Sequence, residues 1–244
     1  MSFKKSIILG VLAMFATLPA MAAIQTYSVT TKFIEPDTEP ANTWFVGTFS
    51  FNTVSKTVSG LQGWLSESMT GTVDYNPATG INGTDDMTWV QLTNQLDATY
   101  DASLGGLLVT TFLNSTTSTF VDAAGSTSDG WTPGVGHTRN NGSNNAYARI
   151  FVNTVDPLAT LTSSQINKLA YADCTAGGMM GPTCMTGTSI AGYGRVGTMG
   201  GFPVSQTMTL LSTTPVPEAD TYAMLALGLG VLGWVGRQKR QSMV

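Results

Sequence analysis

The sequence predicts an all-β domain, a β-sandwich or a jelly-roll-like barrel, between two hydrophobic chain ends. Short segments rich in Val, Thr, Phe and Tyr recur between Gly, Pro and Asn residues, as is typical of strands joined by turns. Residues 43–51 also place Phe45, Phe49 and Phe51 at alternate positions, which is the period of a half-buried strand. No repeat of fixed period is visible, and the roughly 190 residues between the two ends suffice for one core.

The expected elements follow one another along the chain. Residues 43–51 and 56–61 predict a hairpin joined across residues 52–55. Residues 163–170 predict the one helical segment, with Thr162 or Ser163 as its N-cap. Further strands are expected over residues 24–33, 64–75, 87–92, 107–113, 146–152, 190–196 and 205–211.

The N-terminus has the three parts of a signal peptide. Lys4 and Lys5 precede an apolar run, and small residues follow at Ala20 and Ala22. This pattern predicts cleavage before Ala23 by signal peptidase. A permanent N-terminal anchor is the alternative, and the run is shorter than the ~20 residues of a spanning helix.

The C-terminus predicts a second membrane-directed segment. The run Pro215-Val216-Pro217-Glu218 breaks the chain, and residues 222–236 are uncharged and mostly apolar. The basic residues that follow favour the cytoplasmic side of the membrane. We therefore predict a short transmembrane helix over residues 222–236 that holds the middle of the chain outside the cytoplasm, with a buried core helix as the alternative. The membrane-flanking basic residues are Arg237, Lys239 and Arg240.

The order Val216-Pro217-Glu218, an apolar run, Trp234 and a basic tail resembles the PEP-CTERM sorting signal of Gram-negative bacteria. Ala219 stands where a second proline is common. The resemblance implies that an exosortase, an integral-membrane cysteine transpeptidase-like enzyme, cuts at or near Pro217 and Glu218 and passes the protein to the cell surface or biofilm matrix. Residues 145–206 also resemble a region of uncharacterised members of that group, from which no activity follows.

The chain is thereby divided into a signal peptide (1–22), a secreted β domain (23–213) and a sorting signal (214–244). The mature part from Ala23 to Thr214 has 13 acidic and 6 basic residues, a net charge of about −7. Nucleic acid is bound through basic patches, so this charge argues against it as a partner.

Cys174 and Cys184 are the only cysteines. In an oxidising compartment we expect them to form a structural disulfide. A ring of about ten residues would stabilise the fold by ~2–3 kcal/mol. A soft copper site with Met179, Met180 and Met185 is the alternative interpretation.

No motif identifies a reaction, and we expect no catalytic residue, cofactor or metal. The single histidine is His137, and the sequence has no nucleophile elbow, zinc-protease helix or phosphate loop. A Ser-His-Asp triad from distant positions and a carboxylate pair for glycoside hydrolysis remain alternatives. The run Asn82–Asp86, and separately Asp122 with Asp129, are candidate Ca²⁺ ligands, with solvated turns as the other interpretation.

Two functions of different class are compatible with these features. The first is a non-enzymatic surface or matrix protein whose aromatic side chains contact exopolysaccharide, with Trp131, Tyr147 and Tyr193 as the stacking candidates. The second is a secreted hydrolase that acts on polysaccharide. The sorting signal, the β pattern and the lack of catalytic motifs favour the first.

Overall fold

The computed structural model describes residues 22–34, 42–66, 70–113, 120–121, 127–128, 145–173, 175, 185–188, 203–216 and 227–230. The chain divides into two compact units. Gln25–Thr213 form one unit, and the two chain ends, Met1–Ile24 with Thr214–Val244, form the other.

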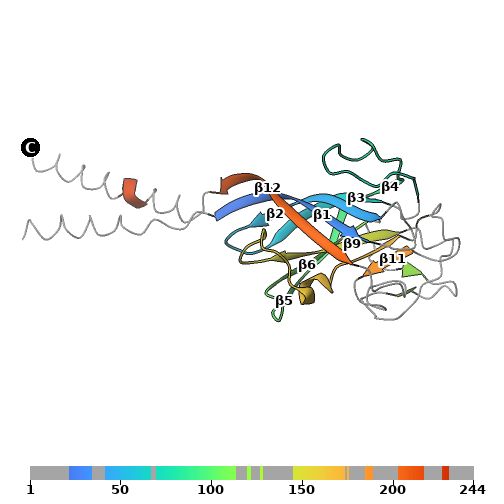
Figure 1. Ribbon diagram of the computed structural model, residues 1–244. Helices are drawn as coiled ribbons and strands as arrows, with labels where there is room; N and C mark the ends of the chain where they lie inside the picture. Colours follow the sequence, from blue (N-terminus) through green and yellow to red (C-terminus); the bar gives the residue numbers. More distant parts are fainter. Residues whose placement is uncertain are drawn as a thin grey trace, which may run out of the picture. The chain divides into compact units, whose positions relative to one another are not determined.

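Two five-stranded sheets make up the first unit (Figure 1). The first sheet has the order β12-β1-β2-β3-β4 and the second has the order β11-β10-β9-β6-β5. The first comprises β1 (Ala22–Phe33), β2 (Thr43–Asn52), β3 (Val58–Ser66), β4 (Trp89–Leu92) and β12 (Val204–Val216). The second comprises β5 (Asn94–Asp101), β6 (Gly106–Phe112), β9 (Ala146–Asn153), β10 (Ala170–Asp173) and β11 (Met185–Thr188). A separate pair is formed by β7 (Phe120–Val121) and β8 (Thr127–Ser128).

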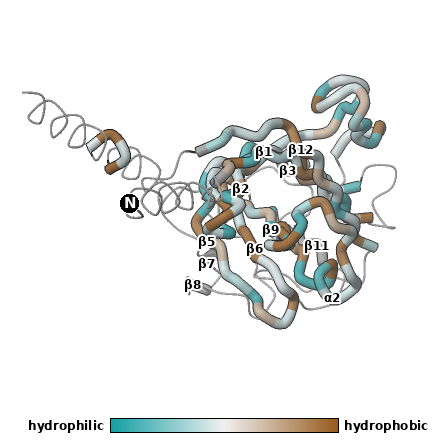
Figure 2. Tube along the Cα trace, turned by 90° about the vertical axis from the view of Figure 1, so that its left-hand side faces the viewer, coloured by the Kyte–Doolittle hydropathy of each residue, from teal (hydrophilic) through white to brown (hydrophobic). Residues whose placement is uncertain are grey.

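The two sheets share one hydrophobic core, which confirms the predicted all-β, sandwich-like class. Phe45 and Phe49 of the first sheet are buried in the same cluster as Val109 and Ile150 of the second. Each such side chain contributes roughly 1.5–3 kcal/mol relative to an exposed one. Figure 2 shows β1, β3 and β12 on one side of this core and β5 and β6 on the other.

Aromatic pairs hold the core both within and between the sheets. Tyr27 stacks on Phe49 with 5.4 Å between ring centroids. Phe33 of β1 meets the edge of Tyr171 of β10 at 4.8 Å, and the Tyr171 hydroxyl accepts a hydrogen bond from Thr43 Oγ1 of β2. Tyr171 therefore links the second sheet to two strands of the first.

The hairpin of β2 and β3 forms where the sequence predicts it. The Asn52 side chain accepts hydrogen bonds from the backbone N–H groups of Val54 and Ser55. Lys56 has a φ of 56°, which lets its N–H return to the Asn52 carbonyl.

The expected helix is present but shorter. Helix α2 covers Ser163–Ile166, and Thr162 caps it in a reciprocal capping box with Gln165. Ala170, expected on the apolar face of this helix, instead begins β10 and is fully buried. Leu169 is also buried in the core cluster. Leu169 and Ala170 are therefore apolar because they are buried in the folded domain, and not because the helix continues to them.

Other strand predictions differ in part from the structure. Residues 70–75, expected to continue a strand, lie in a loop between β3 and β4. Strands β5, β10 and β11 were not predicted. The expected strand over 190–196 lies outside the described residues.

Two glutamine side chains join the sheets through backbone groups. Gln206 of β12 accepts a hydrogen bond from Phe151 N–H of β9 at 3.1 Å and donates to the Phe151 carbonyl at 2.7 Å. Gln95 of β5 accepts from Leu61 N–H of β3 at 2.8 Å and donates to the Val58 carbonyl at 3.0 Å. Each amide therefore replaces the peptide group of an absent neighbouring strand.

Several predicted sites lie outside the described residues. At the chain ends these are Ala20 of the signal-peptide junction, Pro217 and Glu218, and the basic residues Arg237, Lys239 and Arg240. The two cysteines, Cys174 and Cys184, also lie outside the described residues. Residues 227–230 of the predicted transmembrane segment are helical. Within the described part of the chain, no helix has the length and apolar character to span a membrane.

The disulfide between Cys174 and Cys184 stays a prediction. The register of β10 and β11, which adjoin the two cysteines, is compatible with it. Asp173 of β10 lies directly opposite Met185 of β11 in the antiparallel pair. Cys174 follows the first of these residues and Cys184 precedes the second.

The Gln206 contact predicts a measurable contribution to stability. We expect Gln206→Leu to lower the free energy of unfolding by about 2 kcal/mol or more, because it leaves the N–H and carbonyl of a buried residue without partners. Urea unfolding of the secreted protein measures this. The matched control is Gln91→Leu, since Gln91 is exposed and makes no side-chain hydrogen bond to the described residues. Equal unfolding midpoints for the two variants would contradict the role of Gln206.

Candidate functional site

The outer face of the first sheet carries an exposed tryptophan. Trp64 of β3 lies directly opposite Val46 of β2 and Gln91 of β4. Trp64 retains 38% of its surface exposed, and Gln62 and Gln91 are also exposed. These four side chains, Val46, Gln62, Trp64 and Gln91, form what we term the Trp64 face. A large ring with an indole N–H, flanked by two amides, is suited to bind a ligand that has both apolar and hydroxyl-bearing surface.

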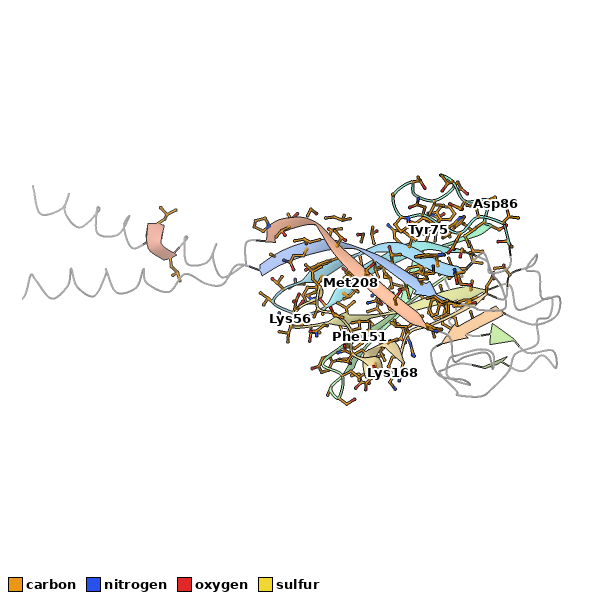
Figure 3. The ribbon with its side chains drawn as sticks, in the orientation of Figure 1. Lys56, Tyr75, Asp86, Phe151, Lys168 and Met208 are labelled. Carbon is orange, nitrogen blue, oxygen red and sulfur yellow. The ribbon has the colours of Figure 1, made fainter. Side chains whose placement is uncertain are left out.

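An aromatic cluster next to the Trp64 face fixes one end of it. The loop between β3 and β4 folds back so that Tyr75 and Met87 are buried against Trp44. The ring of Tyr75, which Figure 3 labels, lies 5.2 Å from that of Trp44 and 5.4 Å from that of Trp89, and both ring pairs are edge-on. Such ring pairs are worth about 0.5–1.5 kcal/mol beyond the area that they bury. The loop is therefore packed onto the sheet.

Asp74 is the polar anchor of this loop. Its carboxylate accepts hydrogen bonds from Trp44 Nε1 at 2.6 Å, from Asn42 Nδ2 at 2.8 Å and from Lys32 Nζ at 3.1 Å. Lys32 Nζ also lies 4.4 Å from the centroid of the Trp44 ring. One carboxylate thereby joins the loop to β1 and β2. Within the described residues, Asp74 and Lys32 form the ion pair of this region, and their charges cancel.

The environment of Asp74 favours its charged form. Partial burial raises the pKa of the carboxyl, but the hydrogen bonds from Trp44, Asn42 and Lys32 and the charge of Lys32 outweigh this effect. The pKa of Asp74 is therefore lowered from its ordinary value of 3.8.

Asp85 and Asp86 serve as hydrogen-bond acceptors within the same loop. Asp86 accepts from the backbone N–H groups of Val73 and Thr72 and from the Thr72 hydroxyl, at 2.8, 2.6 and 2.9 Å. These bonds, led by that from Val73, lower the pKa of Asp86. Asp85 accepts from Trp89 Nε1 at 2.9 Å and from Asn82 N–H at 3.0 Å.

The calcium hypothesis gains no support from this geometry. The carboxylates of Asp85 and Asp86 face hydrogen-bond donors, and their bonds fit the alternative of a turn. Among the residues with described positions, no three His, Cys, Asp or Glu side chains gather to hold a metal ion. The other candidates, Asp122 and Asp129, lie outside the described residues.

Of the three aromatic residues expected to stack on sugars, Tyr147 is the one that the structure describes. Tyr147 is fully buried in β9, so its prediction as an exposed stacking residue was wrong. Residues 146–152 of β9 are all buried, so both faces of the strand are covered there. Trp131, Tyr193 and the single histidine, His137, lie outside the described residues. Trp64 was assigned only to a strand, because its outward direction depends on which neighbours are buried.

The sorting segment begins on the last strand of the first sheet. Strand β12 is an edge strand, and it includes Pro215 and Val216. Its neighbour β1 begins at Ala22, one residue before the predicted signal-peptide cut at Ala23. The two processing signals therefore adjoin two neighbouring strands.

Acid should loosen the Asp74 anchor. Because the folded-state pKa is lowered, the carboxylate contributes its full stability above its unfolded pKa, and this is lost as pH falls through the folded pKa. We expect Asp74→Asn to lower the free energy of unfolding at neutral pH by about 1–3 kcal/mol, as for other hydrogen bonds to charged groups. The difference from wild type should shrink below about pH 4.

Thermal unfolding from neutral to acid pH measures the Asp74 effect. The control is Asp97→Asn, since within the described part of the chain the Asp97 side chain accepts a hydrogen bond only from the exposed Thr99 hydroxyl. A pH-independent difference between wild type and Asp74→Asn would show that the lost carboxylate charge is not the cause.

One family model matches the chain. Residues 215–241 match the PEP-CTERM protein-sorting motif. No curated protein and no solved structure matches the chain significantly. The resemblance stated from Val216, Pro217, Glu218 and the segment after them is thereby confirmed. The chain carries a C-terminal PEP-CTERM sorting signal, which implies export, processing by an exosortase and association with the cell surface.

Proposed function

We propose that the chain is a non-enzymatic protein of the cell surface or biofilm matrix that contacts exopolysaccharide through the Trp64 face. The sorting motif over residues 215–241 carries the first part of the proposal. Trp64, 38% exposed on the open side of the first sheet, carries the second.

The surroundings of Trp64 favour an uncharged sugar polymer. Its neighbours across the sheet are Val46 and Gln91, and none of them is charged. In the adjacent aromatic cluster, Lys32 and Asp74 form an ion pair of 3.1 Å. A sugar ring presents C–H groups that suit an indole face and hydroxyls that suit amides. The mature chain is acidic overall, so a polyanion would be repelled.

The carboxylates beside the Trp64 face support a non-enzymatic role. Glycoside hydrolysis needs two carboxyl groups that face the sugar across a cleft. Asp74, Asp85 and Asp86 instead each accept at least two hydrogen bonds that fix the β3–β4 loop. Their measurable role is to position the loop.

Surface sorting is tested in the native host. Intact mass and cell fractionation, with and without a functional exosortase, should yield an extracellular species that lacks residues 1–22 and the tail beyond Pro217 and Glu218. This species should depend on the exosortase. Retention of residues 222–244 in the membrane of both hosts would mean that the tail is an ordinary anchor.

Polysaccharide contact is tested by replacing Trp64. We expect Trp64→Ala to weaken retention on the host's exopolysaccharide, or on a neutral β-glucan, by about tenfold, since loss of a ring contact is worth on the order of 1.4 kcal/mol. Affinity electrophoresis measures this. Tyr100→Ala is the matched control, because Tyr100 is 56% exposed on β5 of the other sheet. Equal retention of both variants, or preference of the wild type for a polyuronate, would overturn the proposed contact.

A further inference from the structure

The side chains in the second half of β12 lie outside the core. Val204 is 8% exposed and Met208 packs against the core cluster. From residue 209 to residue 215 every side chain is exposed, including Leu210 at 39% and Leu211 at 56%. This half of an edge strand is thus held by its pairing with β1 rather than by buried side chains. Segments with few buried contacts open most easily.

Two hydrogen bonds show how β12 runs beside β1. Ile34 N–H, directly after β1, donates to the carbonyl of Pro203, directly before β12, at 2.9 Å. Ser28 lies six residues before Ile34, and Thr209 lies six residues after Pro203. The Ser28 Oγ donates to the carbonyl of Thr209 at 3.5 Å. The strands are therefore antiparallel, and the same register places Thr26 opposite Leu211. The end of β12 lies beside the beginning of β1.

The first half of β12 is fixed independently of β1. Gln206 binds both backbone groups of Phe151 in the second sheet. Strand β12 therefore has an anchored part near Gln206 and an exposed part that leads to the sorting motif. Opening the exposed part leaves the Gln206 contact and the core intact.

The sorting motif overlaps the last residues of β12. The matched motif starts at residue 215, and β12 extends to Val216. Enzymes that cut a polypeptide commonly bind the residues before the cut as an extended chain, through backbone hydrogen bonds of the strand type. In the folded domain the strand that leads to Pro217 is paired with β1.

We propose that residues 209–216 are a detachable strand end, which separates from β1 and is bound as an extended chain by the processing enzyme. The proposal rests on the proposed sorting function. The strand leaves β1 before processing, Gln206 keeps the sandwich closed, and the neutral sequence of this segment fits an enzyme groove that recognises backbone rather than charge.

A cross-strand lock tests the release. In the full chain, expressed in the host with its exosortase, Thr26→Cys with Leu211→Cys should form a disulfide that prevents separation of the strands. We expect loss of the processed extracellular form, whereas each single variant is processed as in wild type. The control lock is Thr99→Cys with Leu108→Cys, two residues that lie directly opposite each other in β5 and β6. It should leave processing unchanged.

A second variant approaches release from the other direction. A flexible Gly-Ser insert between Thr214 and Pro215 supplies an extended chain while residues 209–214 of β12 stay paired with β1, and pulse-chase labelling should show faster loss of the tail than in wild type. The same insert in the turn between β2 and β3 is the control. Secreted yield and thermal midpoint verify folding of every variant.

The outcomes separate this inference from the sorting function. If wild type is processed but neither the lock nor the insert changes its rate, the detachable strand is overturned and sorting stands. If wild type keeps its tail in the presence of the exosortase, the sorting function fails and the detachable strand fails with it. Lock and insert acting in opposite directions would support the proposal.

Discussion

The backbone of β9 has a hydrogen-bonding edge that its own sheet leaves open. Strand β10 pairs with β9 only from Ala146 to Arg149, so the N–H and carbonyl of the buried Phe151 have no strand beside them on that side. Gln206 fills this position from the other sheet. On β3, β4 reaches only to Gly63, and Gln95 fills the corresponding gap at Leu61 and Val58. Each sheet thus supplies one amide to the other. Orphaned backbone groups in a core are costly, and the short strands β4 and β10 are tolerated because of these two contacts.

The outer side of the first sheet carries Trp64, which retains 38% of its surface exposed in the described structure and is not part of the core cluster. The β3–β4 loop is fastened beside it by Asp74 and by the rings of Trp44, Tyr75 and Trp89. For the proposed contact with exopolysaccharide, such fixed surroundings lower the entropic cost of binding a flexible polymer.

The Gln206 contact divides β12 into two functional parts. The part that holds Gln206 belongs to the fold, while the exposed part from Thr209 leads to the motif that the processing enzyme reads. Because β1 begins where β12 ends, the domain presents the signal-peptide junction and the sorting motif on adjacent strands.

The sequence by itself determined the features that depend on neighbouring residues in the chain. The alternation of Phe45, Phe49 and Phe51 predicted β2, the Asn52 turn predicted the hairpin, and Thr162 predicted a helix start. The sorting motif was also readable, because an enzyme recognises it as a linear sequence.

Only the tertiary structure decided which side chains face solvent and which bind backbone. Strand β5 was missed because most of it is polar and exposed at an edge, and so lacks an apolar period. Tyr147 looked like a surface aromatic, but β9 is covered on both faces by residues distant in sequence. In the sequence, Gln95 and Gln206 resemble any surface glutamine. Their roles arise because packing two sheets places each amide against a strand edge that is formed more than 30 residues away in the chain.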